Sequence, residues 1–553
     1  MGEAATDGLA WTLDSDHFPD PVTRWSSTLY TTYETRIVAR VLTEIGLLLG
    51  GVAFREFDGR IYSAVVPLGG RSRTAPPRWL IPVMCRTVPR LRRRLAAGHT
   101  ADVTDWPGRV VEEWEAGAEE ELLERGKGYL AGDLAALTTG QVAARLEEQL
   151  RFTEECLSWH ARLHVAGADA IGRLGLEVTR SHGWAAGELV DLFTGLSPST
   201  TEPAEAQRAI VDLVREAGAL PVLDAAGTLA DVAAISPAVS AALQGYQELW
   251  GQRAVRYEVA CPTVVEHPEW LLRQLQDAAH LPADRKEVAQ RHEATRATAE
   301  ARLLAALGNS SLTRRRLARA RRVFPHREGN EAATIGIPVA GLRRLGLHIG
   351  GRLGLYRPED AFDLTFEEIV EALRRPDDVG DRAPLALQRR EERERMAAKA
   401  PAPEIGEPPA NPPDRRGFPR AAVEQLDALL WYTDQVMAPL GSARLDDGVI
   451  SGLGASPGVY EGRARLVRDE GDFERIRPND VVVCPITSPV WSIVLPGVGA
   501  LVCDGGGVLS HSAIIAREFG VPAVVATTSA TTIIPEGGRV RVDGRAGEVT
   551  LLG

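Results

Sequence analysis

Residues 503–525 read CDGGGVLSHSAIIAREFGVPAVV, and this stretch decides how the C-terminal part of the chain folds. Three glycines end at Gly507, and His511 follows between two serines. The next residues are apolar with the spacing of a short amphipathic helix, and Gly520 stands where a glycine commonly ends a helix. The pattern predicts a glycine loop that runs directly into a helix, with His511 at the junction.

This junction favours one kind of chemistry. The first N–H groups of a helix have no partner inside the helix, and the helix dipole is positive there, so the position suits an anion such as phosphate. The same environment disfavours a charged imidazolium, so we expect a neutral ring with a free lone pair. Such a ring can attack phosphorus and become a phosphohistidine. The candidates for cradling the phosphoryl group are Gly505, Gly506, Gly507, Ser510 and Ser512, and either serine can cap the helix.

The sequence around this stretch is rich in short β-type runs. GRARLV, DVVVCP, ALVCDG, VPAVVAT, RVRVDG and EVTLL are separated by Gly, Pro and Asp turns. We therefore expect a C-terminal α/β domain over residues 446–553.

The preceding residues predict a mostly helical body over 1–388. Thr138 and Thr365 each stand three residues before a glutamine or glutamate, which is the signature of a capped helix start. A small β-hairpin is expected near 52–67, around Asp58-Gly59, and the second capped helix is expected to stop at Pro376. Residues 389–445 are expected to form a proline-rich linker and one connecting helix.

Composition excludes several functions. The 553 residues carry a net charge of −12, which argues against a general nucleic-acid or membrane-surface binder. The five cysteines show no metal-binding spacing, and no apolar segment has the length of a membrane span. We expect a cytoplasmic protein with no metal site of its own.

Other residues are weaker candidates. His160 and His164 lie one helical turn apart, where a metal is one interpretation and a core or pocket-lining role is another. Arginines are concentrated over residues 314–327, up to His326 and Arg327, and they form either an exposed helix face or a rim for an anionic group. His17, His160, His164 and His326 are candidates for a general base by residue type alone.

The motifs GASPGVYEGRARLV, GGGVLSHSAIIAREFGVPAVV and GGRVRVDGRAGEVTLL closely resemble the swivelling phosphohistidine domain of phosphoenolpyruvate-utilising enzymes, the family that includes rifampicin phosphotransferase. WTLDSDHFPDPVT and RPEDAFDLTFEEI resemble its helical acceptor-binding part. The fold class that follows is a multidomain protein with a mostly α-helical acceptor-binding body and a C-terminal α/β swivelling domain.

The resemblance implies that His511 takes a phosphoryl group at one active site and swings to deliver it at another. Neither an ATP-grasp region nor a phosphoenolpyruvate-binding barrel is recognisable, so the arrangement resembles the histidine-bearing subunit of phenylphosphate synthase. A separate ATP-grasp partner is therefore expected to use Mg²⁺ and ATP, giving AMP and phosphate, while this chain alone binds neither.

The chain departs from the family pattern at two places. It has Thr487-Ser488 where relatives commonly have Thr-Asp, and Cys503-Asp504 precedes the glycines. Thr487 remains a supporting candidate near the phosphoryl site. Arg517 matches the family and serves either packing or chemistry.

The function predicted from these features is a dikinase-type phosphotransferase subunit that acts on a small-molecule acceptor, in natural-product biosynthesis or antibiotic modification. The alternatives are a phospho-carrier or regulatory binding protein, and a repurposed homologue that dehydrates or condenses an activated substrate.

Overall fold

The computed structural model describes residues 8–15, 17–68, 76–280, 285–308, 310–375, 381–407, 415–437, 445–446 and 448–552. The chain forms two compact units, each built from segments that are distant in sequence. The first unit comprises Met1–Ala166, Arg256–Cys261 and Asn330–Asp427, and the second comprises Gly167–Val255, Pro262–Gly329 and Ala428–Gly553. The division into sequence domains 1–388, 389–445 and 446–553 stays a prediction, and residues 376–380, 408–414, 438–444 and 553 lie outside the described residues.

A small antiparallel sheet belongs to the first unit. The predicted hairpin is present as β2 (Leu49–Phe57) and β3 (Arg60–Pro67). Asp58 and Gly59 join the strands with φ of 47° and 76°, the left-handed conformation that a tight two-residue hairpin turn requires. β1 (Trp11–Leu13) pairs with β3, and β4 (Glu404–Ile405), from the proline-rich segment, pairs with β1.

Helices make up the rest of the first unit, and both predicted capping boxes are present. Gln141 accepts the Thr138 N–H at 2.8 Å, and Glu368 accepts the Thr365 N–H at the same distance. The long helix α8 and the connecting helix α20 each continue into the second unit. The helices are α2 (Arg24–Thr28), α3 (Thr35–Glu44), α4 (Ile81–Thr87), α5 (Pro89–Val103), α6 (Trp106–Glu113), α7 (Glu119–Ala131), α8 (Thr139–His182), α17 (Ile337–Arg352), α18 (Phe366–Arg374), α19 (Ala383–Ala397) and α20 (Arg420–Met437).

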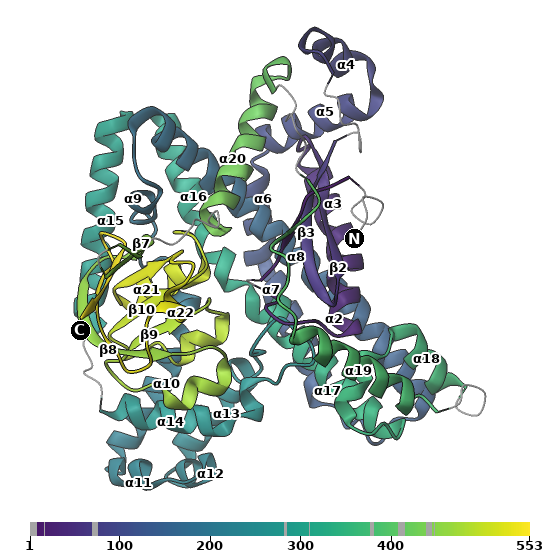
Figure 1. The fold of residues 1–553 in the computed structure, drawn as a ribbon, viewed down its shortest axis with the longest axis vertical. Helices are drawn as coiled ribbons and strands as arrows, with labels where there is room; N and C mark the ends of the chain where they lie inside the picture. Colours follow the sequence, from purple (N-terminus) through teal and green to yellow (C-terminus); the bar gives the residue numbers. More distant parts are fainter. Residues whose placement is uncertain are drawn as a thin grey trace. The chain divides into compact units, whose positions relative to one another are not determined.

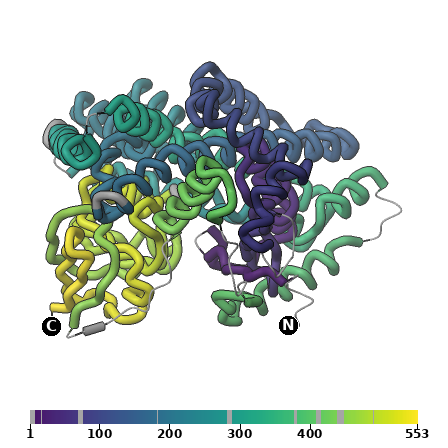
Figure 2. The backbone as a smooth tube through the Cα atoms, turned by 90° about the horizontal axis from the view of Figure 1, so that it is seen from above, coloured from purple at the N-terminus to yellow at the C-terminus, as the bar shows by residue number. Residues whose placement is uncertain are grey.

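The second unit combines helices with a large sheet. Its helices are α9 (Ala186–Val190), α10 (Pro198–Glu216), α11 (Leu220–Ala225), α12 (Leu229–Ala233), α13 (Pro237–Leu249), α14 (Pro268–Ala279), α15 (Arg285–Leu307), α16 (Ser311–Gly329), α21 (His511–Phe519) and α22 (Ala530–Ile533). The nine strands follow the order β5-β6-β13-β12-β8-β9-β10-β11-β7 among the described residues, and Figure 2 shows the chain segment that contains them in yellow-green and yellow beside the C-terminus. They are β5 (Leu445–Asp446), β6 (Val449–Ser451), β7 (Leu453–Ser456), β8 (Val459–Leu466), β9 (Val481–Cys484), β10 (Ala500–Cys503), β11 (Ala523–Val525), β12 (Arg539–Asp543) and β13 (Glu548–Leu552).

The centre of this sheet positions α21. Strands β8, β9, β10 and β11 are parallel, and α21 is the crossover between β10 and β11 (Figure 1). The runs VVVC and ALVC are fully buried because both faces of the central strands are covered, as in parallel sheets generally. Val502 contributes to the core on one face, whereas Cys503 and Ala513 of α21 contribute to the core on the other. The fold class expected from sequence, a mostly helical body with a C-terminal α/β region, is confirmed.

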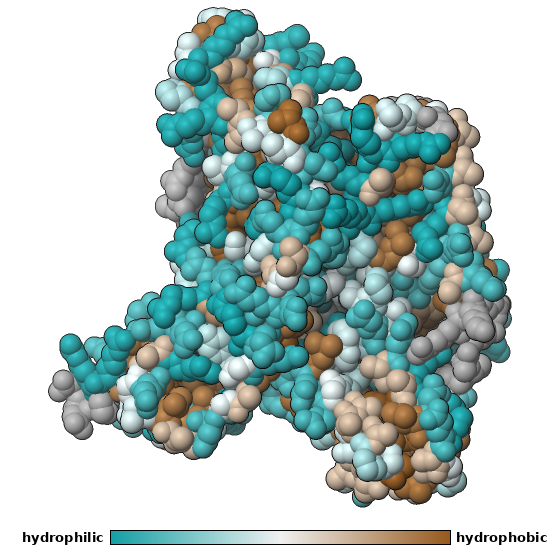
Figure 3. Space-filling view, turned by 180° about the vertical axis from the view of Figure 1, so that it is seen from behind, coloured by the Kyte–Doolittle hydropathy of each residue, from teal (hydrophilic) through white to brown (hydrophobic). Residues whose placement is uncertain are grey.

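One face of the molecule is mostly hydrophilic. In Figure 3 hydrophilic residues cover most of this face, and a larger group of apolar residues lies at its lower right. Among the described helices, none combines the length and the apolar character that a membrane crossing requires.

Candidate phosphohistidine site

His511 is the first residue of α21, directly after the loop that leaves the carboxyl end of β10. Ser510 caps the helix, because its Oγ accepts the Ala513 N–H at 3.4 Å. At the other end, Gly520 has φ of 67° and closes the helix in the left-handed conformation. Of the two serines considered for the cap, the structure selects Ser510.

The glycine loop is packed too closely for larger residues. Gly506 has φ of 82°, and a Cβ on Gly507 would lie only 2.1 Å from the Gln435 carbonyl oxygen at the end of α20. The N–H groups of Gly505, Gly507 and Ser510 donate to main-chain carbonyls within the second unit. The N–H groups of His511 and Ser512, in the first turn of α21, have no carbonyl acceptor within the helix and can serve an anion.

A carboxylate holds the His511 ring. Nδ1 of His511 lies 2.8 Å from Oε2 of Glu328, near the end of α16. The two side chains are 20% and 11% exposed, so this pair is largely shielded from solvent. A carboxylate can only accept, so Nδ1 carries the hydrogen and Nε2 carries the lone pair. Nε2 is buried and has no hydrogen-bond partner among the described residues, so no hydrogen bond engages its lone pair.

Arg327 contacts Glu328, and Tyr432 contacts Arg327 in turn. The buried Arg327 Nε is 3.4 Å from Oε1 of Glu328, and the Arg327 guanidinium lies over the Tyr432 ring, 5.4 Å from its centroid. Burial raises the pKa of Tyr432 to about 12, and the Glu328 charge acts in the same direction while Arg327 opposes it. A buried guanidinium beside the partner of His511 is suited to binding a phosphoryl group.

Thr487 and Ser512 fasten the start of α21. Their hydroxyls are hydrogen-bonded at 2.8 Å, and the Thr487 N–H also donates to Ser512 Oγ at 3.3 Å. Both side chains are buried. In this structure the Ser512 hydroxyl is therefore engaged with Thr487.

Arg517 contacts the histidine loop from nearly two turns further along α21. Its Nη1 donates to the Val508 carbonyl and its Nη2 to the Gly187 carbonyl, each at 3.2 Å. Burial lowers the pKa of Arg517 to about 10. These contacts are those of a positioning residue.

Asp504 also belongs to the loop framework. Its carboxylate accepts from the Thr527 hydroxyl at 3.1 Å and from the hydroxyl and N–H of Thr531. The carboxylate that precedes the glycines thus links the end of β10 to the segment after β11 and to α22. Among the described residues, no three His, Cys, Asp or Glu side chains are grouped closely enough to hold a metal ion.

The remaining sequence candidates have different locations. In the second unit Thr487 contacts the start of α21 and Arg517 contacts the His511 loop, whereas Arg327 contacts Glu328, the partner of His511. His326 lies half-buried in α16, whereas His160 and His164 belong to the first unit, where their ring centroids are 4.1 Å apart. His160 contacts Asn330 Oδ1 at 2.9 Å.

The arginine-rich run on α16 serves mainly to join neighbouring helices. Arg316 pairs with Glu177 of α8, and Arg321 pairs with Glu300 of α15, each at 2.7 Å. Sequence reasoning missed Glu328 and Tyr432, although Glu328 follows directly on Arg327. Only the fold shows their role, because 183 residues separate Glu328 from His511.

Two known protein families match the parts of the chain that contain His511 and Glu328. Residues 476–547 match the mobile domain of PEP-utilising enzymes, which contains His511. Residues 165–328 match the fourth domain of rifampicin phosphotransferase, and the last matched residue is Glu328. The family resemblance expected from sequence is confirmed.

Individual relatives agree with this class. The chain is 34% identical over 194 residues to the uncharacterized phosphotransferase YvkC of Bacillus subtilis, covering 35% of this chain and 21% of the relative. It is 34% identical over 201 residues to a rifampicin phosphotransferase of Streptomyces sviceus, covering 36% of this chain and 20% of the relative. It is 38% identical over 141 residues to the chondramide synthase of Chondromyces crocatus, covering 26% of this chain and 4% of the relative. The chain thus spans about a fifth or less of the length of these relatives.

Proposed function

We propose that this chain is a phosphotransferase component that carries a phosphoryl group on Nε2 of His511 and delivers it to a small-molecule acceptor. The observation that carries the proposal is the contact between His511 Nδ1 and Glu328, which leaves Nε2 with its lone pair and without a hydrogen-bond partner among the described residues. The matches to the mobile domain and to phosphotransferases support the same class of reaction.

The chemistry follows from the groups around the ring. As Nε2 forms a bond to phosphorus, the P–O bond of the donor breaks and the imidazole becomes positively charged. Glu328, which accepts the Nδ1 hydrogen, stabilises that charge. The first N–H groups of α21 and the Arg327 guanidinium stabilise the phosphoryl oxygens. On discharge the P–N bond breaks, and the acceptor oxygen takes the phosphoryl group.

The donor in this proposal is ATP, bound with Mg²⁺ on a separate ATP-grasp protein that releases AMP and phosphate. The residues of this chain hold and orient the imidazole and the phosphoryl group. The helical body binds the acceptor. The similarity to a protein named chondramide synthase supports a role in natural-product biosynthesis.

The experiment is mass spectrometry of the intact chain and its peptides at alkaline pH, where phosphohistidine survives. The chain is incubated with Mg-ATP, with and without the ATP-grasp protein. The predicted result is one phosphate on His511 that requires the partner, is lost in His511→Gln and is retained in His280→Gln, a change at an exposed histidine of the same unit. No phosphate on His511, while the partner is shown to be active by AMP formation, would overturn the proposal.

A further inference from the structure

The first unit contains a second group of acid–base side chains, remote in sequence from His511. We call it the His17 cluster, and it consists of Asp14, His17, Tyr30, Glu34, Tyr257 and Glu331. All six belong to the first unit, although they come from three separate segments of the chain.

A carboxylate holds the His17 ring through Nδ1, as in many active sites where a histidine acts as a base. Oδ1 of Asp14 lies 2.7 Å from the His17 Nδ1 and also accepts the His17 main-chain N–H at 3.3 Å. The His17 side chain is 46% exposed, whereas Asp14 is 8% exposed. The buried carboxylate therefore fixes the ring and its tautomer, and Nε2 is the nitrogen that keeps the lone pair.

A second titratable group interacts electrostatically with His17. Glu34 ends the π-helical turn Leu29–Glu34, a type of turn that is rare and frequent at functional sites. Burial raises the pKa of Glu34 to about 7, with His17 lowering it and Asp14 raising it. Tyr30, on the same turn, also has a raised pKa, first from burial and then from Glu34.

Tyr257 packs against the His17 ring. The two rings meet edge to face, with centroids 5.0 Å apart and planes at 72°. The Tyr257 hydroxyl donates to Glu331 at 2.8 Å. A second π-helical turn, Ala332–Gly336, begins directly after Glu331. Two acidic residues at the ends of irregular helical turns, Glu34 and Glu331, therefore both act on Tyr30.

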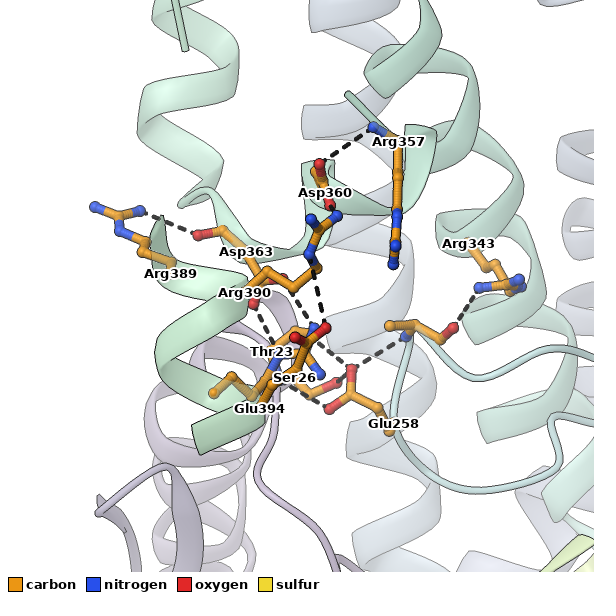
Figure 4. A network of polar contacts seen from close by, with 12 residues as sticks. Thr23, Ser26, Glu258, Arg343, Arg357, Asp360, Asp363, Arg389, Arg390 and Glu394 are labelled. Atoms are coloured by element: carbon orange, nitrogen blue, oxygen red, sulfur yellow. Dashed lines mark hydrogen bonds and ion pairs between the residues drawn. The ribbon is translucent and has the colours of Figure 1, made fainter. Parts of the chain in front are cut away.

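The loop that carries Tyr257 is fixed by a network shown in Figure 4. The Glu258 carboxylate accepts from the Thr23 N–H at 3.0 Å, the Ser26 hydroxyl at 2.8 Å and the Ala260 N–H at 3.1 Å. It also accepts from the Thr23 hydroxyl, and Arg343 donates to the Ala260 carbonyl. These bonds insert residues 256–261 into the first unit and hold Tyr257 against His17.

We propose that the His17 cluster is the site where the hydroxyl group of the acceptor loses its proton, with His17 as the catalytic base and Asp14 as its positioning residue. The inference rests on the proposed function and adds the acceptor side of the reaction. The O–H bond of the acceptor breaks as its proton passes to His17 Nε2, and the oxygen forms the new bond to phosphorus. The P–N bond of phospho-His511 breaks, and its electron pair returns to the imidazole of His511.

The test starts from chain that has already been phosphorylated on His511, so that loading and discharge are measured separately. The probes are ethanol, trifluoroethanol and phenol, whose hydroxyl groups become steadily more acidic. Transfer of phosphate to each probe is followed by phosphorus NMR. We expect His17→Ala to lower the rate to ethanol by about 10²- to 10⁴-fold, and the rate to the more acidic phenol by less.

Rescue separates a catalytic base from a structural residue. Added imidazole is expected to restore transfer in His17→Ala, because the half-exposed position leaves room for a free base. Asp14→Asn is expected to slow transfer by about 10-fold or more, as loss of an orienting carboxylate does. The matched control is His99→Ala, at an exposed histidine of α5 in the same unit, which is expected to behave as wild type.

The outcomes distinguish the two proposals. Failure of His511 to take a phosphoryl group contradicts the proposed function. Three results would contradict the role of the His17 cluster while His511 is still phosphorylated normally. They are wild-type transfer rates in His17→Ala, failure of imidazole to rescue His17→Ala, and absence of transfer from the wild type to any probe. Each of them leaves the phosphohistidine proposal intact.

Discussion

Nδ1 of His511 and Oε2 of Glu328 lie 2.8 Å apart, and they join the start of α21 to the end of α16 across 183 residues of sequence. We expect this pair to decide which ring nitrogen reacts. Because Nδ1 is occupied by the carboxylate, the phosphoryl group is expected on Nε2, and the same carboxylate is placed to stabilise the charged phosphorylated ring.

Removing this partner should slow phosphorylation without unfolding the loop. We expect Glu328→Ala to lower the rate of phosphate incorporation at His511 by about 10- to 100-fold, as loss of a group that orients a reactive imidazole does. Glu328→Gln, which can still accept the Nδ1 hydrogen through its amide oxygen, should retain more activity. Rates are measured by quenched-flow mass spectrometry at alkaline pH. Equal rates for the wild type and Glu328→Ala would show that the contact has no part in the reaction.

The cap on α21 should contribute measurably to stability. Ser510→Ala removes the hydroxyl that accepts the Ala513 N–H, so we expect a loss of about 1 kcal/mol in the free energy of unfolding. Urea unfolding followed by circular dichroism measures this change. Ser510→Asp, which preserves an N-terminal cap, should recover most of the loss, and equal stability of all three proteins would contradict the assigned cap.

Close packing of the loop against α20 predicts intolerance at Gly507. A methyl group there would meet the Gln435 carbonyl oxygen at 2.1 Å, so Gly507→Ala must displace the loop or the end of α20. We expect a lower melting temperature and slower phosphorylation of His511. Gly128→Ala is the control, because that helical glycine has open space around its Cβ position. Its melting temperature should be unchanged or higher, since alanine favours helix over glycine by up to about 1 kcal/mol.

Glu518 should make stability depend on pH. Burial raises its pKa from 4.5 to about 7, and it accepts the Gly195 N–H at 2.9 Å. The folded state therefore binds a proton more tightly than the unfolded state. The resulting contribution is fully present below pH 4.5 and is lost as the pH rises through about 7.

Glu518→Gln tests this effect because glutamine does not ionise. Relative to wild type, the variant should gain about 2 to 3 kcal/mol in the free energy of unfolding between pH 5 and pH 8, at 1.36 kcal/mol per unit of pKa shift. Urea unfolding of both proteins at the two pH values measures the difference. A difference that stays constant with pH would show that Glu518 does not titrate as stated.

Features encoded by neighbouring residues could be predicted from the sequence. The hairpin turn at Asp58-Gly59 needs two residues that tolerate positive φ, and the caps at Thr138 and Thr365 need only a partner three positions away. The position of His511 at a loop-to-helix junction has the same local origin. Each depends on a few adjacent residues, so sequence alone was sufficient.

Features that depend on distant segments were not predictable in this way. Glu328 and Tyr432 reach the His511 site only because α16 and α20 share a core in the second unit with the His511 loop and α21. Tyr257 reaches His17 because six residues leave the second unit and are bonded into the first through Glu258. No local periodicity encodes these contacts, since they arise from burial and from hydrogen bonds over long sequence separations.

The most direct test of the central claim is the position of the phosphate on the His511 ring. The chain is phosphorylated, unfolded at alkaline pH and studied by proton–phosphorus correlation NMR, which distinguishes the two phosphohistidine isomers. We predict phosphate on Nε2, because Glu328 occupies Nδ1. Phosphate on Nδ1, or none on His511 with an active donor present, would contradict it.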